Sequence, residues 1–168
     1  GQTVKNLISE LKKKNFHNIS LISRSHCKDV ENYYKINEGY IDKEIIKKVI
    51  ESTHILISLP PPYENFVLKN FKNIINESKN LKWLGYLSST SVYGNHDGKW
   101  VDENSITKPQ TTLGKKRLSA EKNLLKLKKL RIFRLSGIYS KKNNVFNRIN
   151  NNQIRVIKGK DNYFSRIY

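Results

Sequence analysis

Residues 84–95, LGYLSSTSVYGN, begin as a short apolar run and continue as a cluster of hydroxyl side chains followed by a tyrosine. Serine is a poor strand former, so Ser88, Ser89 and the two hydroxyl residues after them are unusual at the mouth of a buried strand. The carboxyl end of a strand is where an open α/β sheet binds its ligand. The stretch therefore points to an α/β fold with a ligand site at this strand end.

The rest of the chain supports this fold, because helical and strand patterns alternate along it. Helices are predicted over residues 3–14, 42–51 with Asp42 as the cap, 63–79 and 112–128. Other strands are predicted over residues 18–25, 54–59 and 130–139, with a hairpin at 95–101 and no regular element at 26–41. Unbroken apolar strands separated by helices are typical of a parallel sheet covered on both faces. We therefore expect a doubly wound, Rossmann-like fold.

The fold is expected to be partial, because the chain opens inside a helix with no strand before it. A doubly wound fold places its first strand immediately before that helix. The chain also begins at Gly1 and contains no methionine. Both observations predict that the first strand precedes Gly1 and is missing from this sequence.

Composition restricts the classes of partner. The 168 residues carry a formal net charge of +18, which is typical either of a nucleic-acid binder or of lysines spread over solvated faces. No surface that concentrates arginine and aromatic residues is visible, so nucleic acid is the less favoured partner. No run approaches the roughly 18 apolar residues of a membrane span, which predicts no membrane partner. The single cysteine, Cys27, fits a cytoplasmic protein, and the four histidines show no metal-ligand spacing, so no metal is expected.

Two positions are candidates for binding a dinucleotide. Gly1 stands at the start of the first helix, where it is either the tail of a glycine-rich pyrophosphate loop or an ordinary helix cap. Arg24 follows the second predicted strand, flanked by Ser23 and a second serine. An acidic residue there would bind the 2′-hydroxyl of NAD, whereas a guanidinium suits the 2′-phosphate of NADP. The alternative for Arg24 is an ordinary solvent-facing arginine.

Several segments occur in an order that resembles the extended or atypical short-chain dehydrogenase/reductase superfamily, the NAD(P)-dependent epimerase/dehydratase-like proteins. They are LSSTSVYG (87–94), GKWVDENS (98–105), KP (108–109), GKKRLSAE (114–121) and RIFRLSGIYS (131–140). Residues 154–168 resemble the segment that enters the smaller substrate-side region. The resemblance implies a partial NAD(P)-binding domain over 1–140 and the start of the substrate-side region over 141–168, most of which would follow Tyr168.

The resemblance also assigns roles to individual residues. Ser89 matches the hydroxyl that bonds the substrate oxygen, whereas the Tyr-x-x-x-Lys pair of the active enzymes falls on Leu113 and Arg117. Leu113 carries no titratable proton. Arg117 keeps a positive charge, which could contact the cofactor or pair with Glu121 four residues later. Further cofactor contacts are implied for Ser88, Ser58, Leu59 and Pro60.

With Leu113 in the place of the tyrosine, Tyr93 and Tyr139 are the remaining candidates for proton transfer, although tyrosines in such positions are more often packing residues with a satisfied hydroxyl. The resemblance implies an oxidoreductase- or epimerase-like protein that binds NADP, or alternatively NAD. Its substrate would be a small molecule, such as a sugar nucleotide or another carbonyl or hydroxyl compound. A non-catalytic dinucleotide-binding sensor or scaffold is the second reading, and a basic nucleic-acid binder the third. Related proteins often pair through the helices predicted at 63–79 and 112–128, which leaves a homodimer open.

Overall fold

The computed structural model describes residues 2–24, 30, 32–36, 41–140, 144–153, 163 and 165–167. The chain divides into two compact units. One unit contains residues 1–86 with 124–131, and the other contains residues 87–123 with 132–168. Gly1 lies outside the described residues, as does most of the segment 154–168.

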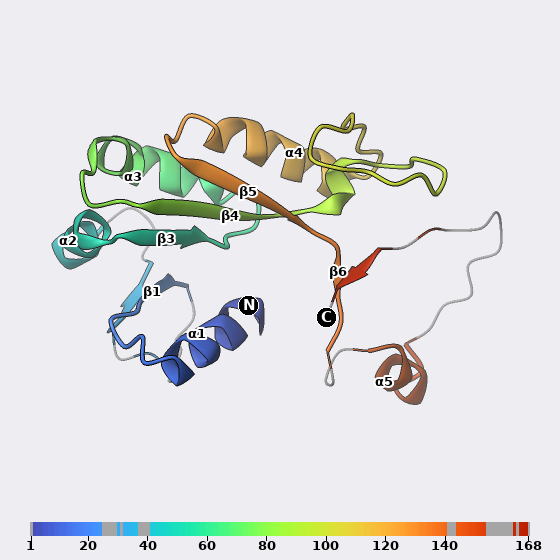
Figure 1. The fold of residues 1–168 in the computed structure, drawn as a ribbon, viewed down its shortest axis with the longest axis horizontal. Helices are drawn as coiled ribbons and strands as arrows, with labels where there is room; N and C mark the ends of the chain where they lie inside the picture. The colour runs from blue at the N-terminus through green and yellow to red at the C-terminus, as the bar shows by residue number, and fades with distance from the viewer. Residues whose placement is uncertain are drawn as a thin grey trace. The chain divides into compact units, whose positions relative to one another are not determined.

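The first unit contains the helices and strands that the apolar pattern predicts and one additional strand, β2 (Figure 1). Its elements are α1 (Gln2–Lys13), β1 (Ser20–Ser23), β2 (Asn32–Lys35), α2 (Lys43–Glu51), β3 (His54–Ile57), α3 (Glu64–Glu77) and the start of β4 (Trp83–Ser89). Strands β1 and β2 pair in parallel, with Ser20 opposite Asn32. The expectation of no element over 26–41 is wrong at β2. Its sequence NYYK lacks an apolar run, yet tyrosine is a good strand former.

Helices α2 and α3 follow from a cap and from apolar spacing. The Asp42 carboxylate accepts a hydrogen bond from the Glu44 amide at 2.9 Å, which confirms it as the α2 cap. In α3, Val67, Phe71 and Ile75 recur every four residues, and all three are buried. This spacing places them on one face of the helix, as a core-facing α-helix requires.

Strands β3, β4 and β5 (Leu130–Leu135) lie side by side in one sheet with β4 in the centre (Figure 1). Strand β3 pairs with β4 in parallel, with Leu56 opposite Gly85. Leu84 and Tyr86 of β4 have no exposed surface, which explains why this strand reads as an unbroken apolar run. The parallel pairing, with helices between the strands, confirms the expected α/β architecture.

The second unit begins at Leu87, within the last three residues of β4. It contains η1 (Thr90–Val92), α4 (Thr112–Leu124), most of β5, β6 (Gly137–Ile138), α5 (Val145–Asn150) and β7 (Arg166–Ile167). The predicted strand 130–139 is divided at Ser136 into β5 and β6, because β6 pairs in parallel with β7. The register sets Gly137 opposite Arg166.

Helix α4 ends at Leu124, four residues earlier than predicted. Asn76 of α3 explains the early end, because its side chain bonds the backbone after the helix at two points. Its amide nitrogen donates to the Lys126 carbonyl at 3.1 Å, and its oxygen accepts from the Lys128 amide at 2.8 Å. Lys129 then adopts a positive φ of 63° immediately before β5.

The predicted hairpin over 95–101 is correct in its turn and wrong in its strands. The Lys99 amide donates to the His96 carbonyl at 3.0 Å, and Asp97 and Gly98 have φ values of 51° and 77°. The flanking residues form no strand. Trp100 is fully exposed, so the flank that follows the turn lacks the packing that a strand needs.

Candidate functional site

The hydroxyl cluster at the end of β4 divides into buried and accessible members. Ser88 is 6% exposed, Ser89 is half-buried and Ser91 is exposed. Ser89 caps η1, since its hydroxyl oxygen accepts from the Ser91 amide at 3.2 Å. A serine that accepts one bond still has its own O–H to donate. Ser89 is therefore held in place at the end of β4, and its O–H donates to no group in the described part of the chain.

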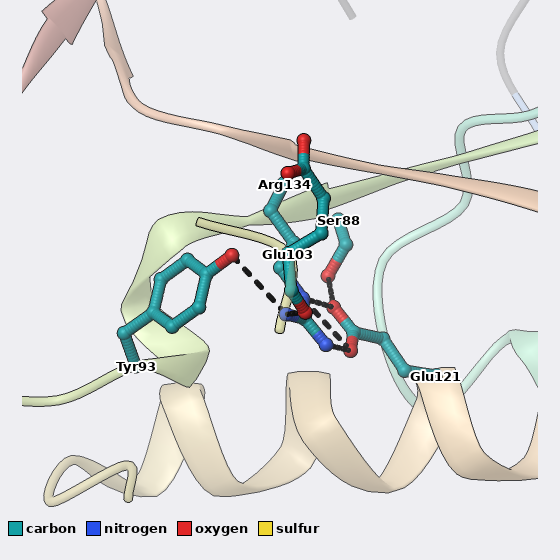
Figure 2. A network of polar contacts seen from close by, with 5 residues as sticks. All are labelled: Ser88, Tyr93, Glu103, Glu121 and Arg134. Atoms are coloured by element: carbon teal, nitrogen blue, oxygen red, sulfur yellow. Dashed lines mark hydrogen bonds and ion pairs between the residues drawn. The ribbon is translucent and has the colours of Figure 1, made fainter. Parts of the chain in front are cut away.

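Ser88 belongs to a buried ionic network that joins β4, α4 and β5 (Figure 2). Its hydroxyl donates to Oε1 of Glu121, which is 2% exposed. Arg134 Nη2 lies 3.0 Å from Glu121 Oε2, and Arg134 Nε lies 3.2 and 3.3 Å from the two carboxylate oxygens. A buried carboxylate is tolerated only when it is paired and hydrogen-bonded, and this network supplies both conditions.

The same guanidinium continues to Tyr93. Arg134 Nη1 donates to the Tyr93 hydroxyl at 3.1 Å and to the Glu103 carbonyl at 3.3 Å (Figure 2). Its carbon Cζ lies 4.9 Å from the centroid of the Tyr93 ring. The hydrogen bonds and charge of Glu121 raise the pKa of Arg134 above its ordinary value. The positive charge of Arg134 is therefore neutralised by Glu121 while it fixes the 6% exposed Tyr93.

Gly94 allows the chain to turn tightly after Tyr93. Its φ is +77°, and a Cβ there would lie 2.0 Å from the Lys108 carbonyl oxygen. The Lys108 amide in turn donates to the Tyr93 carbonyl at 3.1 Å. The motif glycine thus permits the loop over 94–111 to return against the end of η1.

The two positions that replace the Tyr-x-x-x-Lys pair differ in their surroundings. Leu113, near the start of α4, is 78% exposed. Arg117 is half-buried, and its Nη1 donates to the Leu87 carbonyl at 3.2 Å. Glu121, the alternative partner predicted for Arg117, is bound by Ser88 and Arg134. Arg117 therefore places a cation beside the backbone of β4, immediately before the hydroxyl cluster.

In the first unit, the structure brings Arg24 against Tyr63. Arg24 directly follows β1, and its Nη1 donates to the Tyr63 hydroxyl at 2.6 Å. Its carbon Cζ lies 4.2 Å from the centroid of the Tyr63 ring. Tyr63 follows three prolines after β3 and immediately precedes α3. Sequence reasoning missed Tyr63, because only the contact with Arg24, 39 residues earlier, distinguishes it from other exposed tyrosines.

The other cofactor candidates of this unit lie at the same strand ends. The carbonyl of Ser23, the last residue of β1, accepts from the Tyr33 hydroxyl at 3.3 Å and from the Ile36 amide at 3.0 Å. Ser58 and Pro60 are exposed after β3, and Leu59 between them is half-buried.

Among the residues that the structure describes, no group of three or more histidine, cysteine, aspartate or glutamate side chains is arranged to hold a metal ion. None of the helices in the described ranges combines the length and hydrophobicity that crossing a bilayer requires. Glu64, the first residue of α3, is 4% exposed, and its Oε2 has no hydrogen-bond partner in the described part of the chain. Its negative charge lies at the helix end that favours it.

Comparison with known proteins identifies the fold. No protein-family model matches the chain, and no curated protein matches it. A conserved protein of unknown function from Silicibacter pomeroyi is 27% identical, with a TM-score of 0.75 over 96% of this chain and 58% of that one. MoeE5 in complex with UDP-glucose and NAD is 18% identical, with a TM-score of 0.59 over 80% of this chain and 51% of that one.

UDP-N-acetylglucosamine 4-epimerase from Bacillus cereus is likewise 18% identical, with a TM-score of 0.59 over 84% of this chain and 54% of that one. The chain therefore spans little more than half the length of these three proteins. It has the Rossmann-like fold of NAD-dependent epimerase/dehydratase-like proteins. The expected fold class is confirmed.

Proposed function

We propose that this chain is the NADP-binding part of an oxidoreductase- or epimerase-like protein of the atypical short-chain dehydrogenase/reductase branch. The observation that carries the proposal is the state of Arg24 at the carboxyl end of β1. Arg24 is exposed at this strand end and makes no salt bridge with the residues that the structure describes, which supports a role in binding an anion. In a Rossmann-like fold, an arginine near this position accommodates the 2′-phosphate of NADP.

Binding measurements on the intact protein test this proposal. Nicotinamide fluorescence would give the Kd of NADPH and of NADH for the wild type and for Arg24→Ala. A charge-assisted contact is worth about 1.5–3 kcal/mol, so Arg24→Ala should weaken NADPH binding roughly 10- to 100-fold and leave NADH nearly unchanged. Arg131→Ala, which removes another exposed arginine of the same unit, is the matched control. Equal affinity of the wild type for both cofactors would refute the preference for NADP.

For the substrate we propose a sugar nucleotide or a related carbonyl or hydroxyl compound, bound by Ser89. The complex of MoeE5 with UDP-glucose and NAD, on the same fold, supports this class. The O–H of Ser89, which donates to none of the described residues, supports the assigned role. Tyr93 is proposed as the proton-transfer group, since Leu113 has no proton to transfer and the Tyr93 hydroxyl is held by Arg134.

Leu113 also favours a second candidate function, a dinucleotide-binding sensor without turnover. An exposed leucine at the tyrosine position removes the usual acid/base from the helix. The two functions separate when NADPH or NADP is incubated with a panel of sugar nucleotides and the absorbance of the nicotinamide is followed. Turnover that Ser89→Ala and Tyr93→Phe both abolish supports the enzyme. Tight cofactor binding with no turnover across the panel supports the sensor.

A further inference from the structure

Tyr63 occupies a position that its local structure does not explain. It is the residue that caps α3, and its side chain makes no capping hydrogen bond. Serine, threonine, aspartate and asparagine are the residues that stabilise this position, so tyrosine brings no advantage there. The residue is 36% exposed, so burial does not explain it either.

The contacts of Tyr63 instead converge on Arg24. The hydroxyl accepts from Arg24 Nη1 at 2.6 Å, and the guanidinium carbon lies 4.2 Å from the ring centroid. These two contacts restrain the guanidinium group of Arg24, a long side chain that otherwise samples many rotamers. A guanidinium has five N–H donors, and only one of them is used by the Tyr63 hydroxyl.

We infer that Tyr63 is a positioning residue that holds Arg24 at the end of β1, ready to bind the 2′-phosphate of an adenosine ligand. The inference rests on the proposed binding of NADP and assigns a second residue to that site. A guanidinium that is already fixed loses less rotamer entropy when the phosphate binds. Tyr63 therefore strengthens the preference for the phosphorylated cofactor while it acts only through Arg24.

The test compares two substitutions of Tyr63 on the intact protein. Tyr63→Phe keeps the ring and removes the acceptor, whereas Tyr63→Leu removes both contacts. We expect the ratio of the NADH Kd to the NADPH Kd to fall about threefold in Tyr63→Phe and about tenfold in Tyr63→Leu, which corresponds to the loss of one and then both restraints. Phe16→Leu, which replaces a 58% exposed aromatic residue of the same unit, should leave the ratio unchanged.

A double-mutant cycle separates positioning from direct contact. In the Arg24→Ala background, Tyr63→Leu should cause no further change in the ratio, because the residue that it positions is gone. Additive losses would overturn the inference, since they would mean that Tyr63 contacts the cofactor itself. Thermal unfolding of each variant, with a Tm near that of the wild type, ensures that the ratio reports on the site.

The outcomes also distinguish this inference from the proposed function. If the wild type binds neither NADPH nor NADH up to millimolar concentration, the proposed function fails and the inference fails with it. If the wild type prefers NADPH, Arg24→Ala removes the preference and Tyr63→Leu retains it, only the inference fails. Adenosine 2′,5′-bisphosphate and 5′-AMP, compared by calorimetry, should show the same change in ratio as the intact cofactors.

Discussion

The pair Arg24–Tyr63 in the first unit and the pair Arg134–Tyr93 in the second are joined by the same two contacts. In each, a guanidinium nitrogen donates to the phenol oxygen, at 2.6 Å in the first pair and 3.1 Å in the second. The guanidinium carbon also lies near the centroid of the ring, at 4.2 and 4.9 Å. If only these contacts are considered, the two pairs are expected to have the same role.

The pairs differ in what else surrounds the guanidinium. Arg134 is bound by the buried carboxylate of Glu121, whereas Arg24 is exposed and makes no salt bridge with the described residues. Removing one partner of a buried ion pair leaves the other charge buried and uncompensated, whereas substituting an exposed arginine changes the stability of the fold little. Two arginines with the same aromatic contacts therefore differ in whether a buried carboxylate depends on them for its counter-charge.

The largest expected change in the free energy of unfolding comes from substituting Arg134. Arg134→Leu leaves the Glu121 carboxylate buried without its cation, and it should lower the free energy of unfolding by about 3 kcal/mol. This is the low end for a buried pair, because the Arg134 side chain keeps 20% of its surface exposed. Arg24→Leu should change the same quantity by less than about 0.5 kcal/mol. Urea unfolding of both variants measures the difference, and equal losses would remove the distinction between the pairs.

The second expected effect is a partial rescue. Glu121→Gln removes the buried negative charge, so the double variant Arg134→Leu/Glu121→Gln should regain about 1–2 kcal/mol relative to Arg134→Leu. The measurement is again urea unfolding, with Glu121→Gln alone as the control, which should itself be less stable than the wild type. Absence of rescue would mean that Arg134 stabilises the fold through Tyr93 and the Glu103 carbonyl instead of through Glu121.

The sequence predicts the fold well wherever burial leaves an apolar run. Strand β4 could be identified because its interior residues are hidden on both faces, and α2 because Asp42 caps it and Ile45 and Val49 are buried. Strand β2 could not be identified, because its two tyrosines are only half-buried and no apolar run marks it. The strands expected beside Asp97-Gly98 fail for a related reason, since local turn chemistry does not supply a packed partner.

The contacts within the candidate site are harder to predict from the sequence than the fold is. Arg24 could be identified as a candidate from the sequence, because the residues that follow this strand in Rossmann-like folds contact the adenosine ribose of a bound dinucleotide. The pairing of Glu121 with Arg134 could not be predicted from the sequence. Helical spacing favours Arg117, four residues before Glu121, whereas Arg134 lies 13 residues after it, on β5. The role of Tyr63 likewise depends on a contact across the first unit that no local pattern encodes. The ligand-binding roles of Ser89, Tyr93 and Arg24 stay predictions.

A third effect compares the two phenol oxygens. Tyr93→Phe removes a hydrogen bond from a cation to a buried hydroxyl, and it should lower the free energy of unfolding by about 1 kcal/mol. Tyr63→Phe removes a bond at an exposed site, where water replaces the hydroxyl, and should cost less than about 0.5 kcal/mol. Both values come from the same urea titrations. A larger loss for Tyr63→Phe would show that the exposed pair supports the fold and not a ligand.

The smallest expected effect is the response to salt. Exposed charges are screened over a Debye length of about 10 Å at 0.1 M salt and about 3 Å at 1 M, whereas buried pairs are screened much less. If the 2′-phosphate pairs with Arg24 as proposed, raising the salt concentration from about 0.05 to 0.5 M should weaken NADPH binding severalfold more than NADH binding, because NADH lacks that phosphate. In Arg24→Ala the two cofactors should respond alike, while the stability difference between the wild type and Arg134→Leu should change little over the same range. A salt response of NADPH that survives Arg24→Ala would assign the 2′-phosphate to another cation of this basic chain, and the exposed pair would lose the role that distinguishes it from the buried one.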